Sequence, residues 1–134
     1  MSKRAYLDIN IVIDIIDEAR INHDKAKELL LKFIKDEYVV YISEDMISTI
    51  YYVLKGDIRV LYFFKKFLEE WHVVPFGTDV IKKAIEFTIV NNADLEDAMQ
   101  CFCALENRCR FLITNDKNFC DCGIKIVTVE EFLR

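Results

Sequence analysis

Short apolar runs alternate along the chain with segments in which apolar residues recur every three or four positions. Runs of four or five residues, rich in β-branched and aromatic side chains, have the length of buried strands. The predicted strands cover residues 5–9, 38–42, 72–75, 110–113 and 125–128. Helices between such strands favour parallel pairing, because each helix carries the chain back to the start of the next strand. The pattern therefore predicts an α/β fold with three layers, α/β/α, around a parallel sheet of four or five strands.

Helical periodicity is clearest in the segment that follows residue 22. Its apolar residues form one stripe and its lysines lie on the other side, as expected for a helix with one solvated face. This helix is expected to begin at Asn22 or His23. Further helices are predicted over residues 10–17, 45–54, 78–90 and 95–106.

A helix over residues 57–70 has an apolar stripe wider than one core contact requires, and Asp57 is a plausible N-cap. The expected core face contains Leu61, Phe64, Phe67 and Leu68, and the stripe is widened by Val60, Tyr62 and Phe63. Two interpretations remain open: a surface for a second copy of the chain or a partner, or a helix wedged between two others.

Length and composition describe an ordinary globular protein. The 134 residues fit one domain spanning positions 1–134, and 53% of them are apolar, with 3 Gly and 1 Pro. The net charge of −5 disfavours a surface that coats nucleic acid in general but allows a local basic patch. Lys117 is the first basic candidate for guiding RNA, and Arg108, Arg110 and Lys55 are further ones.

No apolar run approaches the roughly 20 residues of a membrane span, and no signal-peptide core follows the N-terminus. We therefore expect a cytoplasmic protein with no membrane contact. Five cysteines without an export signal indicate reduced thiols. Cys101 and Cys103 are interpreted as small core residues, whereas Cys120 and Cys122 could hold a soft metal with Cys109, although their spacing is poor for zinc.

Four carboxylates are expected at one edge of the predicted sheet. Asp8 ends the first strand, Asp116 follows the fourth, and Asp94 and Asp97 open the helix over residues 95–106. In parallel α/β sheets the strand ends and the following helix starts meet at one edge, where ligands bind. Crowded carboxylates repel each other unless a cation lies between them, and oxygen-only ligands favour Mg²⁺ or Mn²⁺. Such an ion can hydrolyse phosphodiesters, although Asp94 and Asp97 could instead be a helix cap and a first-turn acid.

Four segments resemble PIN-domain proteins. The segment YLDINIVID at 6–14 is similar to the strand-then-helix start of that family, in which an Asp and, two residues later, an Asn begin the active site. DLEDAMQ at 94–100, with ALEN at 104–107, resembles the D-x-x-D-A helix of one subgroup. LITNDKNF at 112–119 resembles its T-x-[DN]-x-x-[DN]-F segment, and VTVEEFL at 127–133 its usual end.

The resemblance implies a metal-dependent endoribonuclease, often the toxin of a VapC-type toxin–antitoxin pair held inactive by a small antitoxin. Carried over by position, the catalytic metal carboxylates would be Asp8, Asp97 and Asp116, with Asp94 as an extra acid and Asn10, Thr114 and Asn115 in support. The expected cofactor is Mg²⁺ or Mn²⁺, the substrate is RNA, and a homodimer is expected.

One position departs from the family pattern. Most active members carry a Glu in the helix after the second strand, where this chain has Thr49. A hydroxyl cannot replace an anionic ligand, and Glu44, five residues earlier, points about 140° away around a helix. Glu44 and Thr49 are therefore weak candidates. The alternative function is a PIN-fold module that binds RNA or a protein partner without cleavage.

A phosphoacceptor receiver domain is a further α/β alternative with acids at the sheet edge. Such domains require an acidic pair directly after the first strand. Here Asp8 is followed by Ile9 and Asn10, which disfavours this function.

Overall fold

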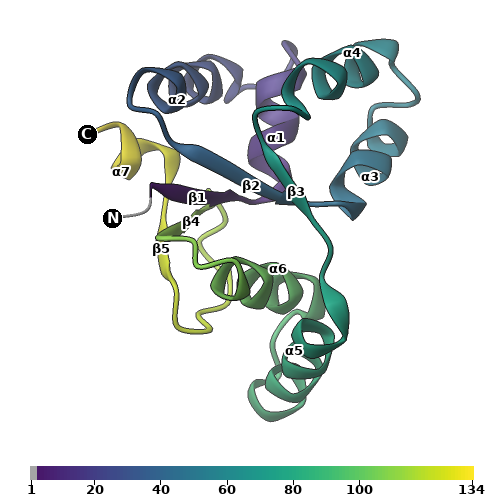
Figure 1. Cartoon of the computed structure of the whole chain (residues 1–134), viewed down its shortest axis with the longest axis vertical. Helices are drawn as coiled ribbons and strands as arrows, with labels where there is room; N and C mark the ends of the chain where they lie inside the picture. Colours follow the sequence, from purple (N-terminus) through teal and green to yellow (C-terminus); the bar gives the residue numbers. More distant parts are fainter. Residues whose placement is uncertain (1–2) are drawn as a thin grey trace.

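A five-stranded parallel sheet forms the centre of the computed structural model, which describes residues 3–134 (Figure 1). The strands are β1 (Arg4–Leu7), β2 (Val39–Ser43), β3 (His72–Val74), β4 (Phe111–Ile113) and β5 (Lys125–Val127). Their order across the sheet is β3-β2-β1-β4-β5, and every neighbouring pair is parallel. The predicted parallel sheet is confirmed, with the first strand of the chain at its centre.

Helices cover both faces of the sheet. They are α1 (Ile9–Ile16), α2 (His23–Lys35), α3 (Asp45–Val53), α4 (Ile58–Phe67), α5 (Gly77–Asn91), α6 (Leu95–Glu106) and α7 (Val129–Leu133). Figure 1 shows α1 to α4 on one side of the sheet and α5 and α6 on the other, which confirms the three-layer prediction. The short α7, beyond the predicted helices, packs its Phe132 ring 5.3 Å from that of Phe33 in α2.

The core lies on both faces of the central strands. Tyr6 and Leu7 of β1, Ile42 of β2 and Leu112 and Ile113 of β4 are fully buried. Because helices cover both faces, neighbouring residues of one strand are buried together, as is usual for parallel sheets. The first predicted strand extended to residue 9, but β1 ends at Leu7 since the next residue already caps α1.

The core face of α4 differs from the predicted one. Val60, Phe64 and Phe67 are buried, whereas Leu61 and Leu68 are 46% and 48% exposed. Phe64 and Phe67 were predicted correctly, whereas Val60 is buried in place of Leu61 and Leu68; spacings of four and three residues put the buried trio on one helix face. The widened stripe therefore leaves apolar side chains on the surface.

A disulfide bond joins α6 to the loop between β4 and β5. Cys101 and Cys122 are bonded, with their Cα atoms 6.2 Å apart. The expectation of reduced thiols is therefore wrong for this pair, and the soft-metal alternative loses Cys122. Cys103 is buried, as predicted for a core residue, and Cys109 is buried too.

Within residues 3–134, none of the helices combines the length and the apolar character that crossing a membrane requires.

Candidate active site

Asp8 occupies the end of the central strand and begins α1. Its side chain is only 7% exposed, and its Oδ1 accepts a hydrogen bond from the Ile9 backbone N–H at 2.8 Å. Its Oδ2 accepts a hydrogen bond from the Thr114 hydroxyl at 2.7 Å. Burial raises the pKa of Asp8 and the nearby Asp116 adds to this, whereas the two hydrogen bonds oppose the shift. Asp8 is thus a buried carboxylate that is held in place on both oxygens.

Thr114 links Asp8 to the loop that follows β4. The buried Thr114 hydroxyl accepts a hydrogen bond from the backbone N–H of Asp116 at 3.1 Å while it donates to Asp8. The Asp116 carboxylate in turn accepts from the N–H of Asn118 at 2.9 Å. Asn115 Oδ1 accepts from the N–H of Val129 at 3.2 Å, at the start of α7. One hydroxyl therefore fixes the relative positions of two acidic residues.

Asp97 enters the site from the first turn of α6. Asp94 is the N-cap of this helix, since its Oδ1 accepts from the Asp97 N–H at 3.0 Å. The pKa of Asp97 is raised to about 6, first by burial and then by the negative charges of Asp94, Asp8 and Asp116. Burial and the negative charges of these acids therefore both disfavour the ionised form of Asp97.

The strand order explains why these acids meet. From β1 the chain moves outward through β2 and β3, and β4 and β5 then lie on the other side of β1. The order therefore reverses between β1 and β4, and ligands of open α/β sheets bind at the carboxyl ends of strands at such a point. Asp8 and Asp116 follow those two strands.

The donor chemistry of this cluster suits a hard divalent cation. The side chains are carboxylates, and a cation would relieve the repulsion that adds to the effect of burial on the pKa of Asp97. Within residues 3–134, however, no group of three or more His, Cys, Asp or Glu side chains is gathered closely enough to hold an ion. The acids share one edge of the sheet without forming a complete ligand set.

A cavity of about 510 Å³ opens beside these acids. The polar residues that line it are Asp8, Asn10, Asp14, Arg20, Asn22, Asn115 and Asp116. Asp14 and Arg20 were missed as site residues from the sequence, although Asp14 lies four residues after Asn10 and hence on the same face of α1. Arg20 Nε lies 3.1 Å from Asp14 Oδ1, which makes an ion pair at the wall of the cavity.

The weak candidates lie away from this cavity. Glu44 and Thr49 are exposed, and neither lines the cavity beside Asp8 and Asp116. Lys117 is exposed next to Asp116 and lines an adjoining cavity of about 390 Å³.

Two of the basic residues that were candidates for guiding RNA lie at the edge of the sheet opposite the acids. Arg108 and Arg110 precede β4, and the Arg110 N–H donates to the Arg4 carbonyl at 2.8 Å, at the start of β1. In a parallel sheet these strand starts lie opposite the edge that carries Asp8. Lys55 instead follows α3 and lines a second cavity.

A buried polar network that was not predicted supports α6 on the sheet. The Tyr6 hydroxyl of β1 donates to Gln100 Oε1, and Gln100 Nε2 donates to Glu96 Oε1 at 3.0 Å. Ser43 of β2 also contacts Gln100, at 3.3 Å. Burial raises the pKa of Tyr6 well above its usual value, so the hydroxyl remains a donor. Because Gln100 is one turn beyond Asp97, this network sets where that carboxylate lies.

Comparison with known proteins identifies the family. A sequence model of the PIN domain matches residues 5–125. Ribonuclease VapC1 of Aquifex aeolicus is 33% identical over 135 residues, which cover 98% of this chain and 94% of that protein.

Solved structures share the fold at lower identity. A toxin–antitoxin complex from Klebsiella pneumoniae contains a chain with a TM-score of 0.71 and 21% identity, covering 93% of this chain and 97% of that one. The sarcin–ricin-loop-cleaving toxin VapC20 of Mycobacterium tuberculosis has a TM-score of 0.72 and 14% identity, with coverages of 90% and 95%. Since the family match and the VapC1 similarity both span nearly the whole chain, this protein belongs to the PIN domain family.

Proposed function

We propose that the protein is a metal-dependent endoribonuclease and the toxin of a toxin–antitoxin pair. The observation that supports this proposal is the pair of acids at the carboxyl ends of β1 and β4, Asp8 and Asp116, which the Thr114 hydroxyl joins through two hydrogen bonds. The similarity to Ribonuclease VapC1 supports RNA as the substrate. The toxin–antitoxin complex from Klebsiella pneumoniae and the toxin VapC20, which share the fold, support the toxin role.

In this proposal Asp8, Asp97 and Asp116 hold Mg²⁺ or Mn²⁺, and Asp94 both caps α6 and adds negative charge. When bound, the ion supplies an activated water and stabilises charge on the phosphate. The hydroxyl of Thr114 orients the Asp8 carboxylate and fixes the backbone of Asp116. Asn10 and Asn115 line the adjacent cavity, where they can contact the RNA strand.

A binding-only PIN module is the second candidate. The observations that favour it are Thr49 at the position of the usual Glu and the absence of a complete ligand set within residues 3–134. Cleavage that stops when a chelator is added separates the two functions, because binding alone leaves the RNA intact.

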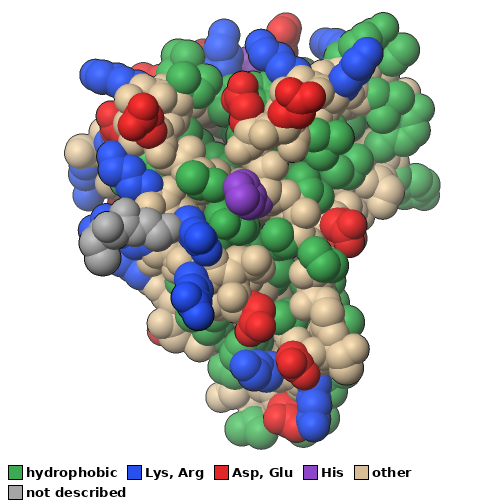
Figure 2. All heavy atoms as spheres, viewed as in Figure 1, with side chains coloured by type: hydrophobic (Ala, Val, Ile, Leu, Met, Phe, Trp, Pro, Cys, Tyr) green, Lys and Arg blue, Asp and Glu red, His purple; other side chains and the backbone are tan. Residues whose placement is uncertain are grey.

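The antitoxin, we propose, covers the apolar surface of α3 and α4. Tyr52 and Tyr62 are 85% and 64% exposed, and Ile58 and Leu61 lie exposed beside them in the sequence. Hydrophobic side chains gather over these two helices at the upper right of Figure 2. Exposed apolar clusters of this kind mark protein interfaces. Protection of Tyr52 and Tyr62 from chemical labelling in the complex would support this surface.

The proposed homodimer uses α5. Ile81, Ile85 and Ile89 are exposed at intervals of four residues, so they form a stripe along one face. A stripe of this kind can pack against its own copy across a twofold axis. Light scattering should give the mass of a dimer for the wild type and of a monomer for Ile85→Lys, while a wild-type monomer would contradict this part of the proposal.

The nuclease activity is tested with a labelled single-stranded RNA. We expect cleavage with Mg²⁺ or Mn²⁺, none with EDTA, and a loss of at least about 100-fold in Asp116→Asn, because removing a metal carboxylate removes most of the charge stabilisation. Asp79→Asn, an exposed acid in the first turn of α5, is the matched control and should cleave normally. Cleavage that persists in EDTA would overturn the proposal.

A further inference from the structure

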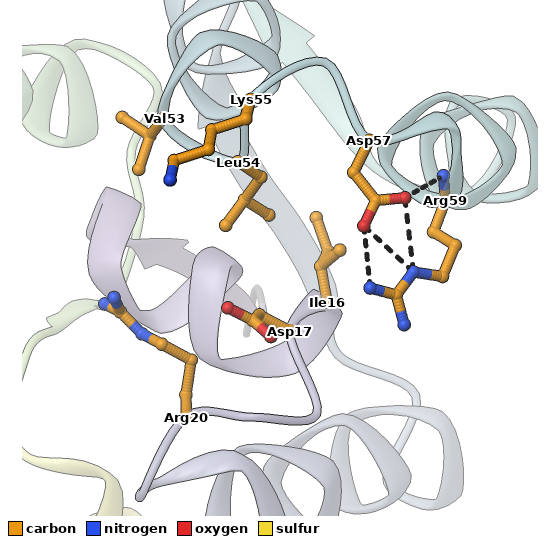
Figure 3. A pocket seen from close by; sticks show the side chains of 8 residues that line it. All are labelled: Ile16, Asp17, Arg20, Val53, Leu54, Lys55, Asp57 and Arg59. Carbon is orange, nitrogen blue, oxygen red and sulfur yellow. Dashed lines mark hydrogen bonds and ion pairs between the residues drawn. The ribbon is translucent and has the colours of Figure 1, made fainter.

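Arg20 lies between two cavities. It lines the cavity that contains Asp8 and Asp116, and it also lines a second cavity of about 340 Å³ between α1 and the turn from α3 to α4 (Figure 3). The second cavity holds two more basic side chains, Lys55 and Arg59. Asp17 and Asp57 line this cavity as well, so Arg20 connects the acidic edge of the sheet to a region with three cations and two acids.

The guanidinium of Arg20 is positioned in advance of any ligand. Its Nε is paired with Asp14, whose side chain is 8% exposed. The loop around it is ordered by backbone hydrogen bonds from Arg20 to Asp17 and from His23 to Arg20, at 3.1 and 3.0 Å. The His23 ring also contacts the Asp14 carbonyl at 2.8 Å. Among the described residues, the terminal nitrogens of Arg20 have no hydrogen-bond partner and can donate to another group.

The two other cations of the second cavity differ in their partners. Arg59 is paired with Asp57 through two of its guanidinium nitrogens, at 2.7 to 3.2 Å. Within residues 3–134, the Lys55 ammonium forms no ion pair and donates no hydrogen bond. In Figure 3 Lys55 and Arg20 project on the same side of the cavity, away from the Asp57–Arg59 pair. Lys55 and Arg20 are therefore the cations available to an anion.

We propose that Arg20 and Lys55 bind successive phosphates of the RNA strand that leads into the acidic site. This inference rests on the proposed ribonuclease function and adds the path of the substrate. A chain with a net charge of −5 repels RNA at long range, so local cations are required near the acids. An arginine whose Nε is already fixed presents its outer nitrogens to a phosphate without further ordering.

The test is the affinity for a fluorescein-labelled single-stranded RNA of ten nucleotides, measured by anisotropy in EDTA so that no metal-dependent cleavage occurs. Arg20→Ala and Lys55→Ala should each weaken binding about fivefold at low salt and reduce the salt slope by about 0.7, the value for one phosphate of a single strand. Arg59→Ala is the matched control, because its charge is already neutralised by Asp57, and its affinity should change less than about twofold.

In Arg20→Ala the Asp14 carboxylate loses its ion-pair partner, so the fold of this variant needs a control. The double variant Asp14→Asn with Arg20→Ala removes both charges, and it should show the same weakened binding with native circular dichroism. Unchanged affinity in Arg20→Ala and Lys55→Ala would overturn the inference, even if the wild type cleaves RNA with Mn²⁺. A wild type that binds RNA through Arg20 but never cleaves it would instead contradict the proposed function alone.

Discussion

At the residue scale, the Thr114 hydroxyl serves two acids at once. It donates to the buried Asp8 carboxylate and accepts from the Asp116 backbone, and Val at this position would keep the shape but make neither bond. A buried carboxylate that loses a donor becomes harder to ionise. The geometry of both acids therefore depends on a side chain that ligates nothing itself.

Thr114→Val should lower the free energy of unfolding by about 1–2 kcal/mol, the cost of leaving buried polar groups without partners. Urea denaturation at pH 7 measures this loss. Thr88→Val is a matched control, because the buried Thr88 hydroxyl has no hydrogen-bond partner and its removal should be neutral or stabilising. Equal effects of the two substitutions would contradict the role given to Thr114.

The raised pKa of Asp97 predicts how stability varies with pH. In the unfolded chain this carboxyl ionises near its usual pKa of 3.8, whereas in the folded protein it ionises near 6. Between these values the folded state binds more protons, so the free energy of unfolding decreases as the pH rises through this range. This decrease in the free energy of unfolding is complete above about pH 6 and absent below about pH 4.

Asp97→Asn should therefore stabilise the metal-free protein at pH 7. Because Asp97 is only partly buried and solvent screens its charge, we expect a gain on the order of 1 kcal/mol. Urea denaturation in EDTA at pH 4, 5, 6 and 7.5 should show the gain growing with pH. A gain that stays constant, or a loss at pH 7.5, would show that Asp97 is free of the field of the other acids.

At the element scale, the Cys101–Cys122 disulfide joins α6 to the loop after β4. These two elements carry Asp97 and Asp116, so the bond ties together the supports of two site acids. Its sequence separation of 21 residues closes a loop of moderate length. Its main expected effect is to reduce the freedom of the unfolded chain.

Reduction of this disulfide should lower the free energy of unfolding by about 3 kcal/mol, as the loop-closure relation gives for this length. Urea denaturation with and without a dithiol reductant measures the difference. Cys122→Ser already lacks the bond, so its stability should not respond to the reductant. If the reductant does not change the free energy of unfolding of the wild type either, this result would contradict the disulfide bond.

The sequence was most informative where one pattern predicts both an element and the candidate site residue that the element carries. Asp8 and Asp116 were expected at the sheet edge because Asp8 ends an apolar strand and Asp116 follows one after two residues, and α6 was predicted with its observed ends because Asp94 caps it. Arg20 was missed because the loop after α1 has no periodicity that reports where its side chains point. The disulfide could not be predicted, since the proximity of Cys101 and Cys122 arises only from tertiary packing.

At the scale of the whole molecule, the strand order places the chemistry. With β1 at the centre, the end of the first strand meets the end of β4, more than a hundred residues later in the chain. The crossover that precedes β4 brings α6 to the same edge, and α1 and its following loop add Asn10, Asp14 and Arg20. The reversal of strand order between β1 and β4 thus explains where the candidate site lies in this fold.

We propose that Asp8, Asp97 and Asp116 together hold one divalent cation. Titration calorimetry with Mn²⁺ at pH 7.5 tests it most directly, on the wild type, Asp97→Asn and the control Asp79→Asn. We expect saturable binding by the wild type and by Asp79→Asn, and affinity reduced by at least about tenfold in Asp97→Asn, because a carboxylate ligand is lost. Equal Mn²⁺ affinity in the wild type and Asp97→Asn, or no binding by the wild type, would contradict the claim.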